Sequence, residues 1–220
     1  MLLVTALMAT TALGIDLMLP AFPDIRAEFG MAADSTKVAW IITAYFLGMA
    51  VGPWCFGPAS DRFGRRTPLR AGLVLYGVSS AVAALAPSWP LVVAARFLWG
   101  IGAAGPRSLS IAMVRDRHEG DAMARLMSMI MAVFLLVPIA APAIGAGLIA
   151  VLPWRAVFWF PVIVSAVLLL WVRRLPETLP DDRRRPFTVR AVLLAGKEVV
   201  TQRSAMMLTI AMTFLFGIMN

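Results

Sequence analysis

Residues Gly57–Leu69 read Gly-Pro-Ala-Ser-Asp-Arg-Phe-Gly-Arg-Arg-Thr-Pro-Leu, and the rest of the sequence can be interpreted outward from them. This arginine-rich stretch lies between two long apolar runs, residues 38–56 and 69–87. A helix needs about 20 apolar residues to cross the hydrocarbon core of a bilayer, and both runs have about that length. Gly57 and Gly64 permit a tight turn and a close approach of the backbone. The stretch therefore predicts a compact loop that joins two transmembrane helices.

The composition also indicates a membrane protein. Of the 220 residues, 60% are hydrophobic and 15% are charged. A soluble domain of this composition would expose too much apolar surface to stay in solution. A net charge of +8 is found in nucleic-acid binders too, but here the arginines lie between apolar runs and not on one polar face. We therefore expect contacts with membrane lipids and no binding of nucleic acid.

The hydropathy pattern predicts an all-α membrane protein with a six-helix transmembrane bundle and the start of a seventh helix. The apolar runs cover residues 2–22, 38–56, 69–87, 90–114, 122–152 and 156–172. The expected domains are the bundle, residues 1–172, a cytoplasmic linker with an amphipathic helix, residues 173–204, and a truncated seventh helix, residues 205–220.

The distribution of Lys and Arg predicts the orientation of these helices. Most of the basic residues follow the second, fourth and sixth runs, whereas the opposite loops hold only Arg26, Lys37 and Arg155. Loops rich in Lys and Arg remain in the cytoplasm. We therefore expect the N-terminus to lie on the cytoplasmic side.

The stretch Gly57–Leu69 resembles the signature between the second and third helices of the major facilitator superfamily, Gly-x-Leu-Ala-Asp-Arg-x-Gly-Arg-Arg-x-x-Leu. A positive-inside loop needs arginine but not this order of residues, so the match is more specific than the orientation rule requires. The resemblance implies two six-helix halves with the substrate site between them. This chain then corresponds to the N-terminal half, and the C-terminal six-helix half is a missing partner. The matching positions are Gly57, Asp61, Arg62, Gly64, Arg65, Arg66 and Leu69.

The resemblance also implies a gate at the cytoplasmic end. In the segment Val-Arg-Asp-Arg, residues 114–117, Asp116 would accept a hydrogen bond from Arg65. Together with a helix of the missing half, this network would hold the gate closed. The alternative is a set of surface ion pairs, each worth less than about 1 kcal/mol.

Three ionisable residues lie at membrane depth: Asp16, Arg96 and Arg107. Each costs several kcal/mol if it faces lipid, so each is expected to face a cavity or a partner. Asp16 and Arg96 lie about six residues, or about 9 Å, from the outer ends of their helices. Because the first and fourth helices line the cavity in the family that the chain resembles, we predict that Asp16 and Arg96 interact, directly or through water, and couple transport to protons. A permanent ion pair is the alternative, and Arg107 is either a second cavity charge or a side chain that extends to the headgroups.

Two further segments carry the resemblance. Residues 96–104, Arg-Phe-Leu-Trp-Gly-Ile-Gly-Ala-Ala, are similar to the fourth-helix motif Arg-x-x-Gln-Gly-x-Gly-Ala-Ala, with Trp99 in place of Gln. Residues 141–146, Ala-Pro-Ala-Ile-Gly-Ala, resemble the antiporter motif Gly-Pro-x-x-Gly-Gly, with an ordinary proline kink as the alternative. We expect a helix bend at Pro138, Pro142 and Gly145. The candidate residues of the substrate cavity are Tyr45, Trp99, Gly100 and Arg107.

The finer resemblance is to drug:proton antiporters of the bicyclomycin and chloramphenicol resistance type. Residues 16–23, Asp-Leu-Met-Leu-Pro-Ala-Phe-Pro, and 175–179, Leu-Pro-Glu-Thr-Leu, match segments of that group. This resemblance implies proton-coupled efflux of small hydrophobic drugs by alternating access in a bacterial inner membrane, driven by the proton gradient without a cofactor or a metal.

Two alternatives stay open at the level of the sequence. One is the export of a sugar or another metabolite. The other is a half-protein that transports nothing alone and either needs a partner or dimerises. An enzyme is not expected, because the sequence contains no set of nucleophile and base, no metal-ligand cluster and no phosphate-binding loop.

Overall fold

The computed structural model describes residues 2–180, 182, 184, 201–202 and 207. The chain divides into two units, Met1–Arg184 and Arg185–Asn220, and all helices discussed below belong to the first. The amphipathic helix expected in the linker and the expected seventh helix lie almost wholly outside the described residues.

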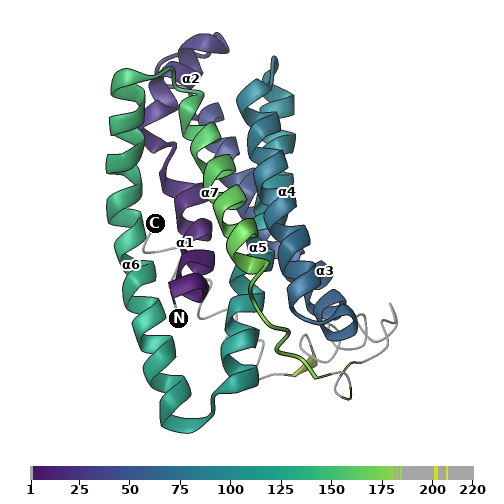
Figure 1. Ribbon diagram of the computed structural model, residues 1–220. Helices are drawn as coiled ribbons and strands as arrows, with labels where there is room; N and C mark the ends of the chain where they lie inside the picture. Colours follow the sequence, from purple (N-terminus) through teal and green to yellow (C-terminus); the bar gives the residue numbers. More distant parts are fainter. Residues whose placement is uncertain (1, 181, 183, 185–200, 203–206, 208–220) are drawn as a thin grey trace. The chain divides into compact units, whose positions relative to one another are not determined.

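The first unit is a bundle of long helices, as the hydropathy pattern predicts (Figure 1). Each predicted apolar run corresponds to at least one helix. Two short 3-10 helices, η1 (Leu19–Ala21) and η2 (Thr36–Ala39), precede α2 and α3. The α-helices are α1 (Leu2–Asp16), α2 (Phe22–Glu28), α3 (Trp40–Phe63), α4 (Arg66–Leu85), α5 (Trp89–Arg117), α6 (Gly120–Val151) and α7 (Ala156–Val172).

Four stretches of the described chain are long and apolar enough to cross a membrane, and α7 is a shorter apolar helix. The four stretches are Leu2–Glu28, Thr36–Phe63, Arg66–Leu85 and Gly120–Val151. Helix α5 is as long as the others, but it carries Arg96 and Arg107 within its apolar run. The buried charge of Arg96 is therefore carried by a long helix that is less apolar than the four stretches.

The first predicted run differs from the expectation because it is not one continuous helix. Helix α1 ends at Asp16, and α2 begins only at Phe22. Pro20 and Pro23 lack the backbone N–H that an α-helix needs at these positions. The break places the carboxyl group of Asp16 at a helix end within the bundle.

Close approach between helices α3 and α5 depends on glycine. A Cβ atom added to Gly100 would collide with the backbone carbonyl of Tyr45, and one added to Gly48 would collide with that of Phe97. Small residues let helix backbones approach closely, which is how helices gain packing energy inside a membrane. Gly145 of α6 allows the same approach to the carbonyl of Leu17.

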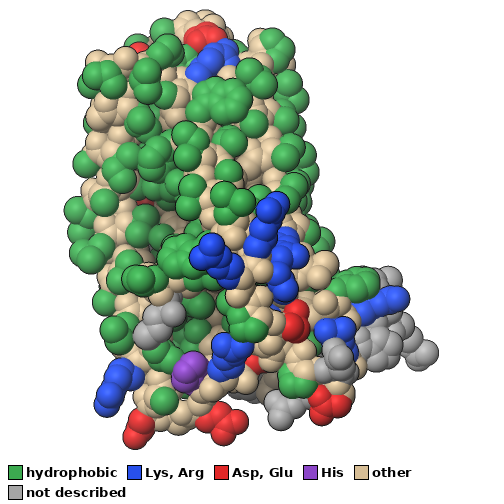
Figure 2. All heavy atoms as spheres, in the orientation of Figure 1, with side chains coloured by type: hydrophobic (Ala, Val, Ile, Leu, Met, Phe, Trp, Pro, Cys, Tyr) green, Lys and Arg blue, Asp and Glu red, His purple; other side chains and the backbone are tan. Residues whose placement is uncertain are grey.

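Helix α6 is covered on one side only. Its buried residues are Ile130, Ala141 and Gly145, and it continues without interruption through Pro138 and Pro142, so the predicted bend stays a prediction. Large apolar side chains cover much of the visible surface of the molecule, whereas charged side chains gather mainly towards one end (Figure 2). Such a surface suits contact with lipid or with other helices.

The opposite end of the bundle is held by a contact between distant segments. Arg155, at the start of α7, forms an ion pair with Glu28 at the end of α2 and donates a hydrogen bond of 2.6 Å to the carbonyl of Ala84. The indole Nε1 of Trp154 donates to the other Glu28 oxygen at 2.6 Å. These bonds tie α2 and α4 to the loop between α6 and α7.

Candidate functional site

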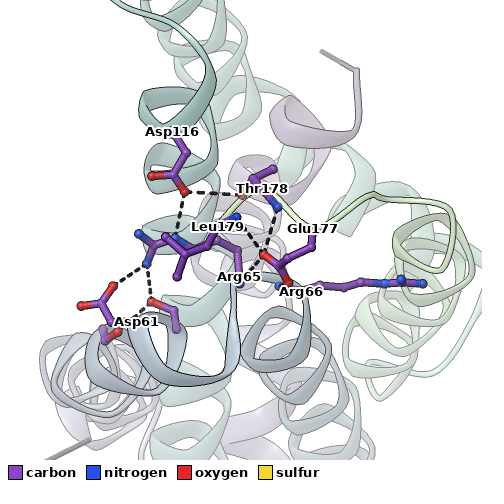
Figure 3. A network of polar contacts seen from close by, with 9 residues as sticks. Asp61, Arg65, Arg66, Asp116, Glu177, Thr178 and Leu179 are labelled. Atoms are coloured by element: carbon purple, nitrogen blue, oxygen red, sulfur yellow. Dashed lines mark hydrogen bonds and ion pairs between the residues drawn. The ribbon is translucent and has the colours of Figure 1, made fainter. Parts of the chain in front are cut away.

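One candidate site is a network of polar contacts at the turn between α3 and α4 (Figure 3). The guanidinium of Arg65 donates to Asp61 at 2.8 Å and to Asp116 at 3.0 Å. It also donates to the hydroxyl of Ser60 at 2.7 Å. The structure therefore brings together Asp61, Arg65 and Asp116, and Asp116 accepts a hydrogen bond from Arg65, as the family resemblance implied.

The turn itself is much shorter than predicted. Helix α3 continues to Phe63, so Gly57 lies inside the helix, and a Cβ added there would meet no neighbouring atom within 4 Å. The expectation that Gly57 forms part of the turn was wrong, because the helix accommodates Pro53 and Pro58 and does not end at the first proline. Of the two glycines, only Gly64 has a backbone conformation that calls for glycine, since its φ of +81° is one that other residues rarely adopt.

A carboxylate that the sequence analysis did not select as a site residue completes the network. Glu177, five residues beyond the end of α7, accepts hydrogen bonds from the backbone N–H groups of Arg65 at 2.7 Å and Arg66 at 3.2 Å. These are the unpaired N–H groups at the start of α4, where a negative charge is favourable. Glu177 was visible in the sequence segment Leu-Pro-Glu-Thr-Leu, but Arg65 and Arg66 lie more than a hundred residues away from it in the chain.

Hydrogen bonds within the network favour the charged forms of Glu177 and Arg65. Burial alone would raise the pKa of the Glu177 carboxyl, but four backbone N–H donors outweigh it and lower that pKa below its ordinary value. Burial also disfavours the charged form of Arg65 and would lower its pKa, but its hydrogen bonds to Asp116 and Asp61 raise that pKa above the ordinary value. At neutral pH both Arg65 and Glu177 are therefore charged.

The segment after α7 is bound to this turn at further points. The hydroxyl of Thr178 donates to Asp116 at 3.4 Å, and the guanidinium of Arg66 donates to the carbonyl of Arg173. Arg62, in contrast, points its guanidinium over the ring of Phe63, 5.1 Å from the centroid, and forms no ion pair within the described chain. Arg62 thus matches the sequence motif but does not join the network.

A second candidate site surrounds Arg96 of α5, which is completely buried. Its Nη1 donates to the carbonyl of Gly14 at 2.9 Å, and its Nε donates to that of Ile41 at 3.2 Å. The guanidinium carbon lies 4.4 Å from the ring centroids of both Tyr45 and Trp99. Arg96 thereby connects helices α1, α3 and α5.

Asp16 and Arg96 were predicted to interact directly or through water, and the direct contact is not present among the described residues, so only the contact through water stays a prediction. The guanidinium of Arg96 donates to two backbone carbonyls and lies near two aromatic rings. Among the described residues, Asp16 forms no ion pair. The remaining nitrogen, Nη2 of Arg96, has no hydrogen-bond partner in the described part of the chain. Arg96 nevertheless binds α1 two residues before Asp16, so the two residues lie in the same region of the bundle.

Three of the four candidate cavity residues lie in the core. Tyr45 donates from its hydroxyl to the carbonyl of Thr11 at 3.0 Å, and its ring packs edge-on against Trp99. Gly100 lies against the backbone of Tyr45. Only Arg107 is exposed, and its guanidinium lies 5.9 Å from the ring centroid of Phe134 of α6. Of the predicted cavity residues, Arg107 alone is placed where a ligand can reach it in this structure.

The bundle consists of long apolar helices, and ion pairs hold the turn between α3 and α4 at Gly64. These features are typical of a multi-pass membrane protein of the transporter class. A sequence model of the Major Facilitator Superfamily matches residues 4–220. The chain therefore belongs to the major facilitator superfamily, whose members move small molecules and are not enzymes.

Two bacterial relatives show the same relationship. An uncharacterised MFS-type transporter YdgK of Bacillus subtilis is 34% identical over 209 residues, which cover 93% of this chain and 51% of the relative. A bicyclomycin resistance protein homolog of Haemophilus influenzae is 29% identical over 207 residues, which cover 93% of this chain and 51% of the relative. The chain thus spans about half the length of these curated relatives.

Solved structures show the fold. The human organic anion transporter MFSD10 has a TM-score of 0.67 at 25% identity, and the match covers 92% of this chain and 53% of that one. The xylose transporter XylE of E. coli, in a partially occluded inward-open conformation, has a TM-score of 0.70 at 16% identity, with 99% of this chain and 59% of that one covered. The six-helix bundle therefore corresponds to the N-terminal half of a major facilitator, as the sequence predicted.

Proposed function

We propose that this chain is the N-terminal half of a proton-coupled exporter of small hydrophobic drugs that works by alternating access in a bacterial inner membrane. Family membership and the relative named for bicyclomycin resistance support this assignment. The observation that carries it is the carboxyl group of Asp16, which lies half-buried at membrane depth and forms no ion pair with any described residue.

Asp16 is the group we assign as proton carrier. Ionisable side chains inside transmembrane segments are costly, and carboxylates kept there serve proton relays in pumps and transporters. Asp16 terminates α1 at the break before η1, so its surroundings change whenever the two parts of this segment move relative to one another. A change of surroundings alters proton affinity, which is what coupling requires.

The network at the α3–α4 turn is the corresponding inner gate. The positive-inside rule assigns the arginine-rich end of the bundle to the cytoplasm. Arg65 joins the end of α3 to the end of α5 through Asp61 and Asp116, while Glu177 fastens the segment after α7 to the start of α4. This arrangement makes the inner end of the half a rigid unit that can rock against the missing half.

The proton carrier can be tested with Asp16→Asn, expressed together with a C-terminal six-helix half and assayed for drug export from cells. The amide has the shape of the carboxyl group but cannot bind or release a proton at neutral pH, so we expect export to be lost while the protein stays folded. Asp34→Asn, in the exposed loop between α2 and η2, is the matched control and should export normally. Normal export by Asp16→Asn would remove the assignment.

A half-protein that acts only with a partner, or as a dimer, is a second candidate. The exposed apolar side of α6 favours it, because Leu135, Leu136 and Ile139 are 68%, 61% and 74% exposed. The mass of the purified chain in nanodiscs, measured with and without a C-terminal half, tests this candidate. A monomer that exports drug alone would contradict it.

A further inference from the structure

Arg107 is a cation at membrane depth for which the proposed mechanism has no use. It lies inside α5, ten residues before the last residue of that helix, Arg117, and its side chain is exposed. Its guanidinium has no carboxylate partner in the part of the chain that the structure describes. Its guanidinium lies 5.9 Å from the ring centroid of Phe134, whose face attracts cations but leaves the N–H donors free.

The position of Phe134 shows which side of the bundle Arg107 occupies. Helix α1 packs against α5, α6 and α7, whereas α5 and α6 make few direct contacts with each other. Arg107 belongs to α5 and Phe134 to α6, so this contact joins the two helices. The exposed side chain of Arg107 therefore lies between α5 and α6.

An apolar cluster closes this region towards the arginine-rich end. Val114 of α5, Ile130 of α6 and Met8 of α1 are buried together, with Ile111 packed against them. Arg107 lies one helical turn from Ile111, and Phe134 lies one turn from Ile130. The cluster thus forms an apolar surface directly beside a free guanidinium and an aromatic ring.

The charges in this part of the bundle have a positive excess. Arg96 and Arg107 both belong to α5, and Arg96 donates to the carbonyl of Gly14, two residues before Asp16. Within the described chain Arg96 contacts two carbonyls and two rings but no carboxylate, so no negative charge pairs with its guanidinium. Two cations and one acid leave a net positive charge whether or not Asp16 carries a proton. Such a site attracts anions and repels cations, and the attraction is strong where the dielectric constant is low.

We propose that Arg107 binds the acidic group of the substrate, and that the substrate is an amphipathic organic anion such as an aryl carboxylate. The carboxylate pairs with the guanidinium through two parallel N–H···O bonds, the geometry that arginine favours. The apolar body of the substrate lies against Phe134 and the cluster beside it. This proposal rests on the transport function proposed above and specifies the charge of the substrate, but it does not depend on proton coupling.

The test compares two probes that differ only in charge, naphthalene-2-carboxylate and naphthalene-2-carboxamide. Binding of each to the 220-residue chain in phosphatidylcholine nanodiscs is measured by calorimetry at pH 7.5. We expect the carboxylate to bind at least about tenfold more tightly, because a charge-assisted pair is much stronger than a neutral hydrogen bond. Arg107→Gln should abolish this preference, and Arg107→Lys should keep part of it. Arg117→Gln, an exposed arginine at the end of the same helix, is the matched control and should change nothing.

Several results would overturn the proposal. They are equal binding of the two probes, a preference that survives Arg107→Gln, and a lack of carboxylate binding by the wild-type chain. Nanodiscs that also contain phosphatidylglycerol distinguish a lipid headgroup from a soluble acid as the source of the anion. If Arg107 holds a lipid phosphate instead, that lipid will displace the carboxylate, and the substrate assignment fails. This binding test measures no proton movement, so its failure would not affect the assignment of Asp16 as proton carrier. Failure of the Asp16→Asn export test would in turn not affect the predicted preference of Arg107 for an anionic ligand.

Discussion

At the scale of single residues, hydropathy predicts the depth of a side chain but not its partner. The positions of Asp16 and Arg96 in their apolar runs placed both in the same region, and Arg96 does bind the backbone of α1 at Gly14. A direct contact between the two is not formed, because the guanidinium instead lies 4.4 Å from the ring centroids of Tyr45 and Trp99, which the sequence does not reveal. Glu177 was missed for a related reason, since its contacts with Arg65 and Arg66 join segments far apart in the chain.

Replacing Glu177 by Gln should destabilise the bundle by about 1 kcal/mol, which is typical of the loss of a capping group at a helix start. The amide keeps the size of the side chain but removes the negative charge that the N–H groups of Arg65 and Arg66 stabilise. Thermal unfolding in detergent at neutral pH measures the effect. Glu119→Gln is the matched control, because Glu119 occupies the N-cap of α6 without a side-chain capping bond and should lose little.

The contribution of Glu177 should also depend on pH. Its pKa is lowered in the folded protein, so the stabilisation is fully present above the ordinary value of 4.5 and is lost as the pH falls through the lowered value. The difference in stability between the wild type and Glu177→Gln should therefore shrink on acidification below pH 4.5. A difference that stays constant down to pH 3 would show that the charge of Glu177 is not what stabilises the turn.

At the scale of the elements, the apolar runs were sufficient to predict the helices of the bundle, whereas their ends depended on local chemistry. The run before the motif was expected to end at Phe56, but α3 continues to Phe63 and leaves only Gly64 and Arg65 as the turn. The run at the N-terminus was expected to be one helix, but it breaks after Asp16. Prolines have opposite outcomes here, since α3 and α6 continue through theirs while the segment at Pro20 does not.

Packing between α3 and α5 predicts a large effect of one methyl group. Gly100→Ala should destabilise the bundle by about 1–3 kcal/mol, because the new Cβ collides with the backbone of Tyr45 and forces the two helices apart. Gly147→Ala in α6 is the matched control, since a Cβ there meets nothing within 4 Å and alanine is the better helix former. Both variants are compared by thermal unfolding in the same detergent. Equal stability of the two would contradict the close approach of α3 and α5.

At the scale of the whole molecule, the chain spans about half the length of its curated relatives and exposes a large apolar surface. The side of α6 away from α1 is apolar and exposed, and the charged groups gather mainly at the end that carries the α3–α4 turn (Figure 2). Composition and motif order were enough to predict the family, because these features depend on the bilayer and on short local segments. The substrate was not predictable in this way, because in this family it binds between two halves and this chain spans about half the length of its curated relatives.

The most direct test of the central claim is drug-dependent proton movement across proteoliposomes that contain this chain and a C-terminal six-helix half. We predict that the drug moves protons across the membrane when both halves are present, and that Asp16→Asn stops this movement while Asp34→Asn does not. Proton movement that persists in Asp16→Asn would contradict the assignment of Asp16. A complete pair of halves that moves drug without any proton would contradict proton-coupled export itself.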